Sequence, residues 1–121
     1  FVFCAIDHGP SRGIIANHLA GCGMTFIDVG IGVDKIDEST CLIARARVTL
    51  VPTGRNDIVK TLPISSDEND AVYDNIQVVE LNSINAAMAI IKYKQHLGFY
   101  SDEEHSNQIR YNLSMGAILS G

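Results

Sequence analysis

Residues 1–32 read FVFCAID, then HGPSRGIIANHLAGCG, then MTFIDVGIG. The first segment is apolar up to Asp7, which is typical of a strand buried on both faces of a sheet. Apolar residues recur at helical spacing in the second segment, from Pro10 or Ser11 to the glycines at its end. Residues 25–32 read as another strand. Strand, helix and strand in this order predict a right-handed parallel unit.

The next part of the chain predicts further strands and one long helix. Residues 33–40 are polar and predict a loop, and residues 41–51 predict a strand. That strand alternates, with an apolar face (Leu42, Ala44, Ala46, Val48 and Leu50) and a mixed face (Ile43, Arg45, Arg47, Thr49 and Val51). Such alternation predicts a sheet that is covered more fully on one face. Residues 109–119 predict a last strand.

Between these strands, residues 52–73 predict a mobile acidic loop, because Pro, Gly, Ser and carboxylates are frequent there. Residues 74–96 predict the longest helix. Its apolar residues surround more than half of the circumference, which indicates burial in a larger body or against a partner chain. A polar stripe of Asn75, Asn82, Asn85, Lys92 and His96 is expected to be a solvated or interface-facing seam.

The composition excludes several classes of protein. The chain has 121 residues, enough for one domain or part of a larger one, and a formal net charge of -5 with scattered basic residues. Nucleic acid is therefore not an expected partner. The three cysteines form no Cys-x-x-Cys pair, which favours a reducing cytoplasm and argues against a zinc site. No membrane span is expected, because every apolar stretch is interrupted by polar residues.

Two stretches carry a resemblance to a known family. The first is the apolar strand that ends in Asp7, with Arg12 five positions later, followed by the strand FIDVGIG at residues 26–32. The second is NIQVVELNSINAA at residues 75–87, which runs on to GFY at residues 98–100. In this order and spacing they resemble the ThiF/MoeB family of adenylating domains, which belongs to the ubiquitin-activating-enzyme superfamily.

The resemblance implies a fold and a place in a larger domain. Residues 1–121 would be the carboxyl-terminal part of one ThiF-type nucleotide-binding domain, an α/β fold with a partial Rossmann-like sheet. The sheet would start with a parallel strand-helix-strand unit, followed by further strands and one long late helix. The chain opens inside an apolar run without Met, so upstream residues, which supply the Gly-rich nucleotide loop in this family, are expected to be missing. The fragment alone is then expected to be inactive.

The resemblance also implies an activity. ThiF-like proteins use ATP and magnesium to adenylylate the carboxyl-terminal Gly of a ubiquitin-like or sulfur-carrier protein. The chain is accordingly expected to be cytoplasmic and homodimeric, with strand exchange between copies as a further expectation for a fragment with an open sheet edge. The zinc-binding cysteine pairs of many relatives are absent, so no zinc is expected.

The resemblance assigns site residues by position. Asp7 matches the carboxylate that handles magnesium and ATP, and its alternative role is to cap the following helix. His8 replaces a commoner Asn next to the nucleotide. Arg12 matches a family Arg, and could approach a phosphate or brace the turn around Asp7. Asp28 is expected to be a structural hydrogen-bond acceptor, and Cys41 to be structural rather than a nucleophile.

Two other functions remain open at this stage. Strand-helix-strand units with Gly-rich exits also occur in dinucleotide-binding oxidoreductase lobes. A non-catalytic dimerisation or carrier-binding module would explain the heavily apolar long helix.

Overall fold

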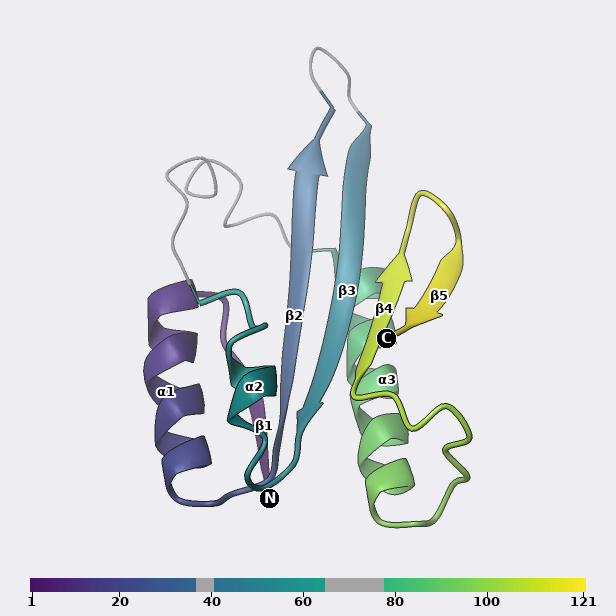
Figure 1. The fold of residues 1–121 in the computed structure, drawn as a ribbon. Coiled ribbons are helices and arrows are strands. Elements are labelled where there is room, and N and C mark those ends of the chain that lie inside the picture. The colour runs from purple at the N-terminus through teal and green to yellow at the C-terminus, as the bar shows by residue number, and fades with distance from the viewer. Residues whose placement is uncertain (37–40, 65–77) are drawn as a thin grey trace.

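The computed structural model describes residues 1–36, 41–64 and 78–121. Along the chain these residues form β1 (Val2–Ala5), α1 (Gly9–Gly21), β2 (Phe26–Lys35), β3 (Leu42–Val51), α2 (Asn56–Val59), α3 (Val79–His96), β4 (Gln108–Asn112) and β5 (Ala117–Ser120). The five strands form one sheet in the order β1-β2-β3-β4-β5 (Figure 1). β1 and β2 are parallel, and the other neighbours are antiparallel. The expected mixed α/β fold with a parallel start is confirmed.

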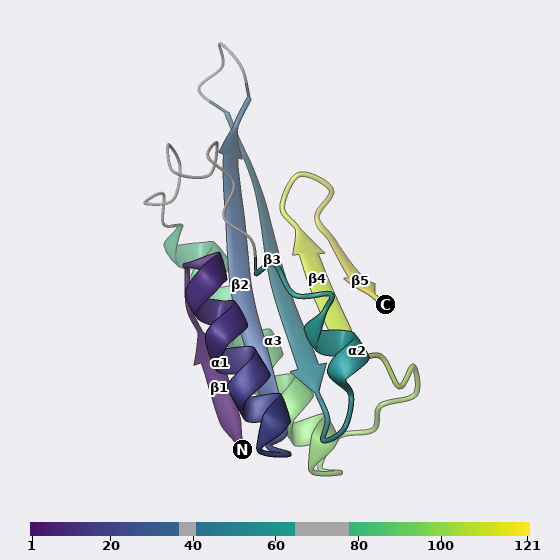
Figure 2. The ribbon, with the colours of Figure 1, turned by 60° about the vertical axis from the view of Figure 1, so that its left-hand side comes forward.

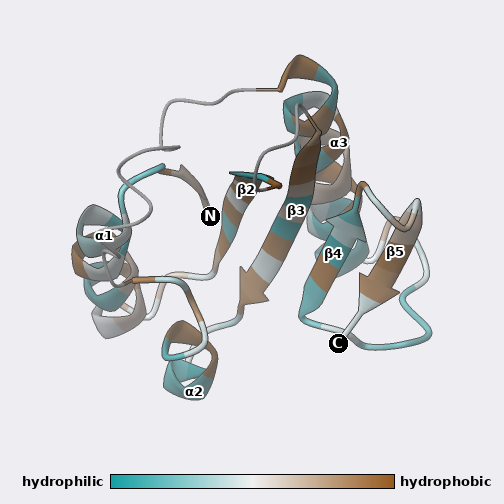
Figure 3. Cartoon of the chain, turned by 90° about the horizontal axis from the view of Figure 1, so that it is seen from above, coloured by the Kyte–Doolittle hydropathy of each residue, from teal (hydrophilic) through white to brown (hydrophobic). Residues whose placement is uncertain are grey.

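Helices cover both faces of the sheet. In Figure 2, α1 and α2 lie in front of the sheet and α3 lies behind it, and the view from above in Figure 3 shows the same two layers. The α3 side buries one core that includes Ile27, Val48, Leu81 and Met88. The α1/α2 side buries a second core around Cys4, Phe26, Val51, Ile58 and Leu62. The alternation predicted for residues 41–51 is confirmed, because Ala44, Ala46, Val48 and Leu50 all face α3.

The sequence between β1 and β2 explains where α1 begins and ends. His8 is the N-cap, and its Nδ1 atom accepts a hydrogen bond of 3.2 Å from the Ser11 backbone N–H. The helix therefore begins before the predicted start at Pro10 or Ser11, and Pro10 lies in its first turn. Gly23 follows the helix with a φ of +68°, a conformation that glycine adopts at little cost.

Three predictions about the strands and loops need correction. β2 extends into the predicted loop at residues 33–40 as far as Lys35, because Val33 pairs with Ala44 and is buried. Residues 37–40 of that prediction lie outside the described residues. The single strand predicted at residues 109–119 is two strands, β4 and β5, joined by a turn. In that turn the Asn112 side chain accepts a hydrogen bond of 3.1 Å from the Met115 backbone N–H, and Gly116 has a φ of +61°.

The predicted loop at residues 52–73 contains α2, whose Ile58 and Val59 are buried in the α1/α2 core. Residues 65–73, and residues 74–77 at the start of the predicted long helix, lie outside the described residues. Among the residues that the structure describes, no helix combines the length and the apolar character needed to cross a membrane.

The orientation of α3 differs from the expectation. Asn85 and Lys92, predicted on a solvated or interface-facing stripe, are 5% and 1% exposed and face the sheet side. Asn85 Nδ2 donates a hydrogen bond of 3.1 Å to the carbonyl of Gly30. Gly30 follows Val29, which is the last residue of β2 that pairs with β1. Polar contacts from remote segments therefore draw polar residues inward, while several apolar residues of the helix face outward.

Candidate functional site

Asp7 lies between the carboxyl end of β1 and the amino end of α1. β1 ends at Ala5, and α1 begins at Gly9 with His8 as its cap, so the helix-capping role considered for Asp7 belongs to His8. Asp7 is exposed. Ligands of parallel sheets bind outside the carboxyl ends of the strands, and the amino end of a helix favours negatively charged groups. The structure thus brings Asp7 and His8 together at a position suited to a ligand.

Arg12 braces the turn that presents Asp7. Its side chain is 7% exposed, and its Nη2 atom donates a hydrogen bond to the carbonyl of Ile6, directly before Asp7. Nη1 donates to the carbonyl of Pro63 at 2.9 Å, and Nε donates to Asp28 Oδ1 at 3.1 Å. Of the two roles considered for Arg12, bracing matches these contacts, because all three guanidinium nitrogens are engaged within the protein.

Asp28 continues this network across the sheet. It is fully buried, and its Oδ2 accepts a hydrogen bond of 2.7 Å from Arg47 Nη2, so that both carboxylate oxygens bind arginines. The expected role of Asp28 as a structural acceptor is confirmed. Arg47 Nη1 donates to Thr49 Oγ1 at 2.8 Å, and Gln108 Nε2 donates to the same oxygen at 3.2 Å. The polar chain consists of Arg12, Asp28, Arg47, Thr49 and Gln108, and it runs from the Asp7 turn to β4.

The polar chain needs the space that Gly30 leaves free because glycine has no side chain. A Cβ atom at this position would lie 2.8 Å from Arg47 Nη2 and 3.4 Å from Arg12 Nη2. We expect Gly30→Ala to displace the Arg47 guanidinium from Asp28 and to lower the free energy of unfolding by about 1–2 kcal/mol. Gly32 is the matched control, since it lies on the same face of β2 with nothing within 4 Å of an added Cβ atom.

Gly32→Ala should be neutral or stabilise by about 0.5 kcal/mol, because alanine loses less backbone entropy on folding. Urea denaturation of the two variants measures both effects. Equal midpoints for Gly30→Ala and Gly32→Ala would show that the arginines do not need the space above Gly30.

The cysteines do not join Asp7 in a reactive site. Cys4 is buried beside the polar chain, and its burial, followed by the nearby negative charge of Asp28, raises its pKa to about 11. At neutral pH the thiol of Cys4 is therefore almost entirely protonated and a poor nucleophile. Cys41 is exposed and precedes β3 at the far end of the β2–β3 hairpin, beyond the Lys35–Leu42 pair. Asp7 instead follows β1, which ends where Ala5 pairs with Val29.

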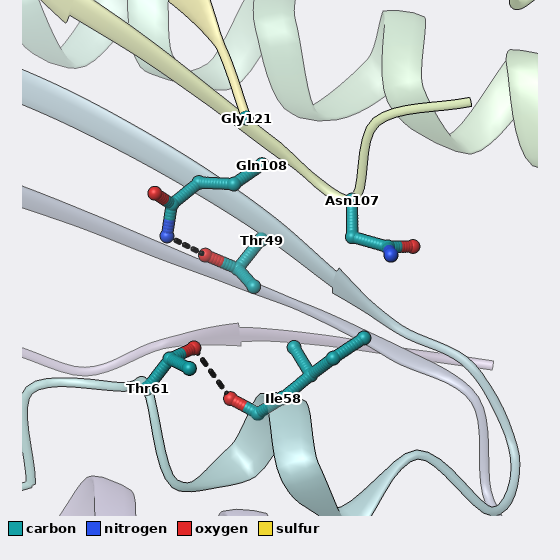
Figure 4. Close-up of a pocket in the computed structure, with 6 residues that line it drawn as sticks. All are labelled: Thr49, Ile58, Thr61, Asn107, Gln108 and Gly121. Carbon is teal, nitrogen blue, oxygen red and sulfur yellow. Dashed lines mark hydrogen bonds between the residues drawn. The ribbon is translucent and has the colours of Figure 1, made fainter. Parts of the chain in front are cut away.

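A pocket lies at the other end of the polar chain. It has a volume of about 230 Å³ and lies between α2 and the β3–β4 pair (Figure 4). Its lining consists of Thr49, Ile58, Thr61, Asn107, Gln108 and Gly121. Sequence reasoning missed this pocket because its walls come from four separate parts of the chain. The one available signal was Thr49, which shares a strand face with Arg45 and Arg47.

Among the described residues, no group of three or more His, Cys, Asp or Glu side chains is placed to hold a metal ion. Comparison of the sequence with models of protein families and with characterised proteins finds no matching family and no matching protein.

Proposed function

We propose that the chain is part of an adenylating domain of the ThiF/MoeB type, which activates the carboxyl-terminal Gly of a ubiquitin-like or sulfur-carrier protein with ATP. The observation that carries the proposal is the exposed Asp7 at the carboxyl end of β1, in a turn held by Arg12. The parallel start of the sheet and the resemblance of residues 1–32 and 75–100 add support.

The surroundings of Asp7 suit the chemistry of this reaction. A carboxylate attacks the α-phosphate of ATP, so two anionic reactants must be held in line while their charge is neutralised. Magnesium in ATP sites is bound mainly by phosphate oxygens and water, with one or two protein carboxylates. A single exposed carboxylate such as Asp7 fits that mode. The protein's own part is to hold the turn still, through the contacts of Arg12 with Ile6 and Asp28.

The test is pyrophosphate release by the whole protein with magnesium, ATP and a carrier that ends in Gly-Gly. We expect Asp7→Asn to lower carrier-dependent release by roughly a hundredfold, because the carboxylate would act on charge that develops in the transition state. Its fold should be unaffected, since Asp7 is exposed and forms no ion pair with a described residue. Asp57→Asn is the matched control, because Asp57 is exposed on α2 and Arg55 is its one ion-pair partner in the described part of the chain.

Unchanged release in Asp7→Asn would remove Asp7 from the site. An absence of both release and ATP binding in the wild-type protein would contradict adenylation and favour a binding or scaffold role.

The outer face of α3 carries exposed apolar residues, and these favour self-association of the chain. Val79, Ile90 and Leu97 are 75%, 46% and 62% exposed and, with the exposed Ala86, recur at intervals of seven and four residues. This spacing places them on one stripe of the helix, as in helices that pair with each other. We propose that two copies of the chain associate through this stripe.

The measurement is sedimentation velocity over a range of concentrations. We expect a dimer for the wild-type protein and a monomer for Ile90→Lys, because a charge in an apolar interface is costly to bury. Ile14→Lys is the matched control, since Ile14 is 73% exposed on α1, at the opposite face of the sheet. A wild-type protein that stays monomeric at all concentrations would contradict association through α3.

A further inference from the structure

One buried oxygen on α3 has no hydrogen-bond partner. Asn85 is 5% exposed, and its Nδ2 atom donates to the carbonyl of Gly30 at 3.1 Å. A carbonyl oxygen can only accept, so this contact fixes which amide atom of Asn85 is the nitrogen and which is the oxygen. The Oδ1 atom is buried and receives no hydrogen bond from the described part of the chain. Buried polar atoms are normally satisfied, and leaving one without a partner destabilises the folded protein.

The neighbours of Asn85 on the helix do not supply a donor. Leu81, Met88 and Ala89 lie on the same buried face of α3, and all three are apolar. Lys92 lies about 10 Å further along the helix, where it is bound to Asp102. The stability of the fold therefore does not explain an amide at position 85. Residues that break a local rule at a cost in stability occur mainly at functional sites.

Asn85 lies at the level of the turn that contains Asp7. Val29 pairs with Ala5, the last residue of β1, and Gly30, the partner of Asn85, is the next residue of β2. Asp7 is two residues beyond Ala5. Gly30 and Asp7 are therefore both just past the carboxyl end of β1.

The direction of α3 agrees with this placement. Tyr93 packs against the rings of Phe1 and Phe3 at the start of β1, with centroid distances of 4.6 and 5.3 Å. Asn85 precedes Tyr93 by eight residues, or about 12 Å of helix, so it lies toward the other end of β1. Ligands of parallel strands bind outside their carboxyl ends. The unsatisfied oxygen thus lies at the end of the sheet where we place the reacting groups.

An oxygen that can only accept requires a ligand that donates. The substrate proposed for Asp7 ends in a Gly carboxylate, which must be held in line with the α-phosphate of ATP. The donor nearest to that carboxylate is the backbone N–H of the same Gly. Because glycine has no side chain, another group can approach this N–H closely.

We propose that Asn85 Oδ1 accepts a hydrogen bond from the backbone N–H of the terminal Gly of the carrier protein. The bond satisfies the buried oxygen and holds the end of the carrier next to Asp7. It also distinguishes a peptide end from a free carboxylate such as acetate, which has no N–H. The inference rests on the adenylation proposed above and names a residue that binds the carrier's last residue.

The test is carrier-dependent pyrophosphate release by the whole protein, measured over a range of carrier and of ATP concentrations. We expect Asn85→Leu to raise the KM for the carrier roughly tenfold, the effect of one hydrogen bond, and to change the KM for ATP less than about twofold. Its urea denaturation midpoint should not fall, because leucine removes the unsatisfied oxygen. Gln95→Met is the matched control. Gln95 Oε1 is also buried without a partner, but the side chain lies ten residues along the helix, bound to the carbonyl of Ser101, and its loss should change neither KM.

A change in the carrier tests the same bond from the other side. A chemically assembled carrier with N-methylglycine as its last residue keeps the carboxylate and lacks the N–H. It should raise the KM roughly tenfold with the wild-type protein and cause no further loss with Asn85→Leu, because both changes remove the same hydrogen bond. N-methylation of the preceding Gly is the control, and its effect should be the same in the two proteins.

Three results would overturn the proposal while adenylation stands. They are an unchanged KM for the carrier in Asn85→Leu, no loss from N-methylation of the last Gly with the wild-type protein, and equal losses from that N-methylation in the two proteins. A raised KM for ATP alone would overturn it in favour of a contact between Asn85 and the nucleotide. A wild-type protein that neither binds ATP nor releases pyrophosphate would contradict adenylation, and this inference with it.

Discussion

Replacing Asp28 with asparagine should lower the free energy of unfolding by about 3 kcal/mol, because it leaves two buried guanidinium groups without their counter-charge. The carboxylate of Asp28 is fully buried, and the side chains of Arg12 and Arg47 are 7% and 17% exposed. Asparagine keeps the shape of the residue but offers one neutral acceptor in place of two charged ones. The loss of charge, and not a cavity, therefore accounts for the expected effect.

Urea denaturation at neutral pH measures the change, and the exposed pair on α2 provides the comparison. Asp57→Asn makes the same substitution in a pair whose side chains are 50% and 67% exposed, so it should leave the denaturation midpoint unchanged within error. If Asp28→Asn changed the denaturation midpoint as little as Asp57→Asn, water would have to reach the two arginines easily. That result would also weaken the role of the polar chain in holding the Asp7 turn.

Local patterns were sufficient to predict the start of the sheet. The apolar run before Asp7, the helical spacing after Pro10 and the second apolar run at residues 25–32 predict a parallel unit, and the β1–β2 pairing confirms it. The alternation in residues 41–51 likewise predicts which side chains of β3 face the larger helix. Such patterns depend on neighbours in the sequence, and so no remote contact is needed to interpret them.

Remote contacts explain the wrong predictions. Asn85 and Lys92 were expected on the outside of the long helix, but their partners, Gly30 and Asp102, lie on segments that the helix pattern does not contain. The end of β2 was placed at Gly32 because two glycines suggested an exit from the sheet. Pairing with β3 instead carries β2 to Lys35. Both errors come from tertiary contacts that outweigh local propensity.

The candidate site was predictable in part. The position of Asp7 after an apolar strand followed from the sequence, and the structure places it at the end of β1. The polar chain was harder to foresee, although arginines at positions 45 and 47 on one strand face could have suggested a carboxylate on a neighbouring strand. The pocket could not be foreseen, since β3, α2, the start of β4 and Gly121 after β5 must be brought together before it exists.

A second large effect is expected at the buried ion pair between α3 and the segment that follows it. Lys92 Nζ lies 2.8 Å from Asp102 Oδ2, and the two side chains are 2% and 23% exposed. Asp102→Asn should lower the free energy of unfolding by about 3 kcal/mol at neutral pH, because a buried ammonium loses its partner. Lys92→Met should cost less than about 1 kcal/mol, because an apolar chain of similar volume replaces the charge and leaves only the more exposed Asp102 unpaired.

The pH dependence of stability separates this ion pair from simple packing. The hydrogen bond from Lys92 holds the pKa of Asp102 below its ordinary value of 3.8. A lowered pKa stabilises the folded protein at pH values above the unfolded pKa, and this contribution is lost as the pH falls through the lower, folded pKa. The contribution of Asp102 to stability should therefore be constant from about pH 5 to 7 and fall below pH 4. In Lys92→Met that part of the acid-dependent loss should disappear. Denaturant midpoints measured from pH 2.5 to 7 test this expectation, and identical pH profiles for the wild-type protein and Lys92→Met would show that the pair does not stabilise the fold.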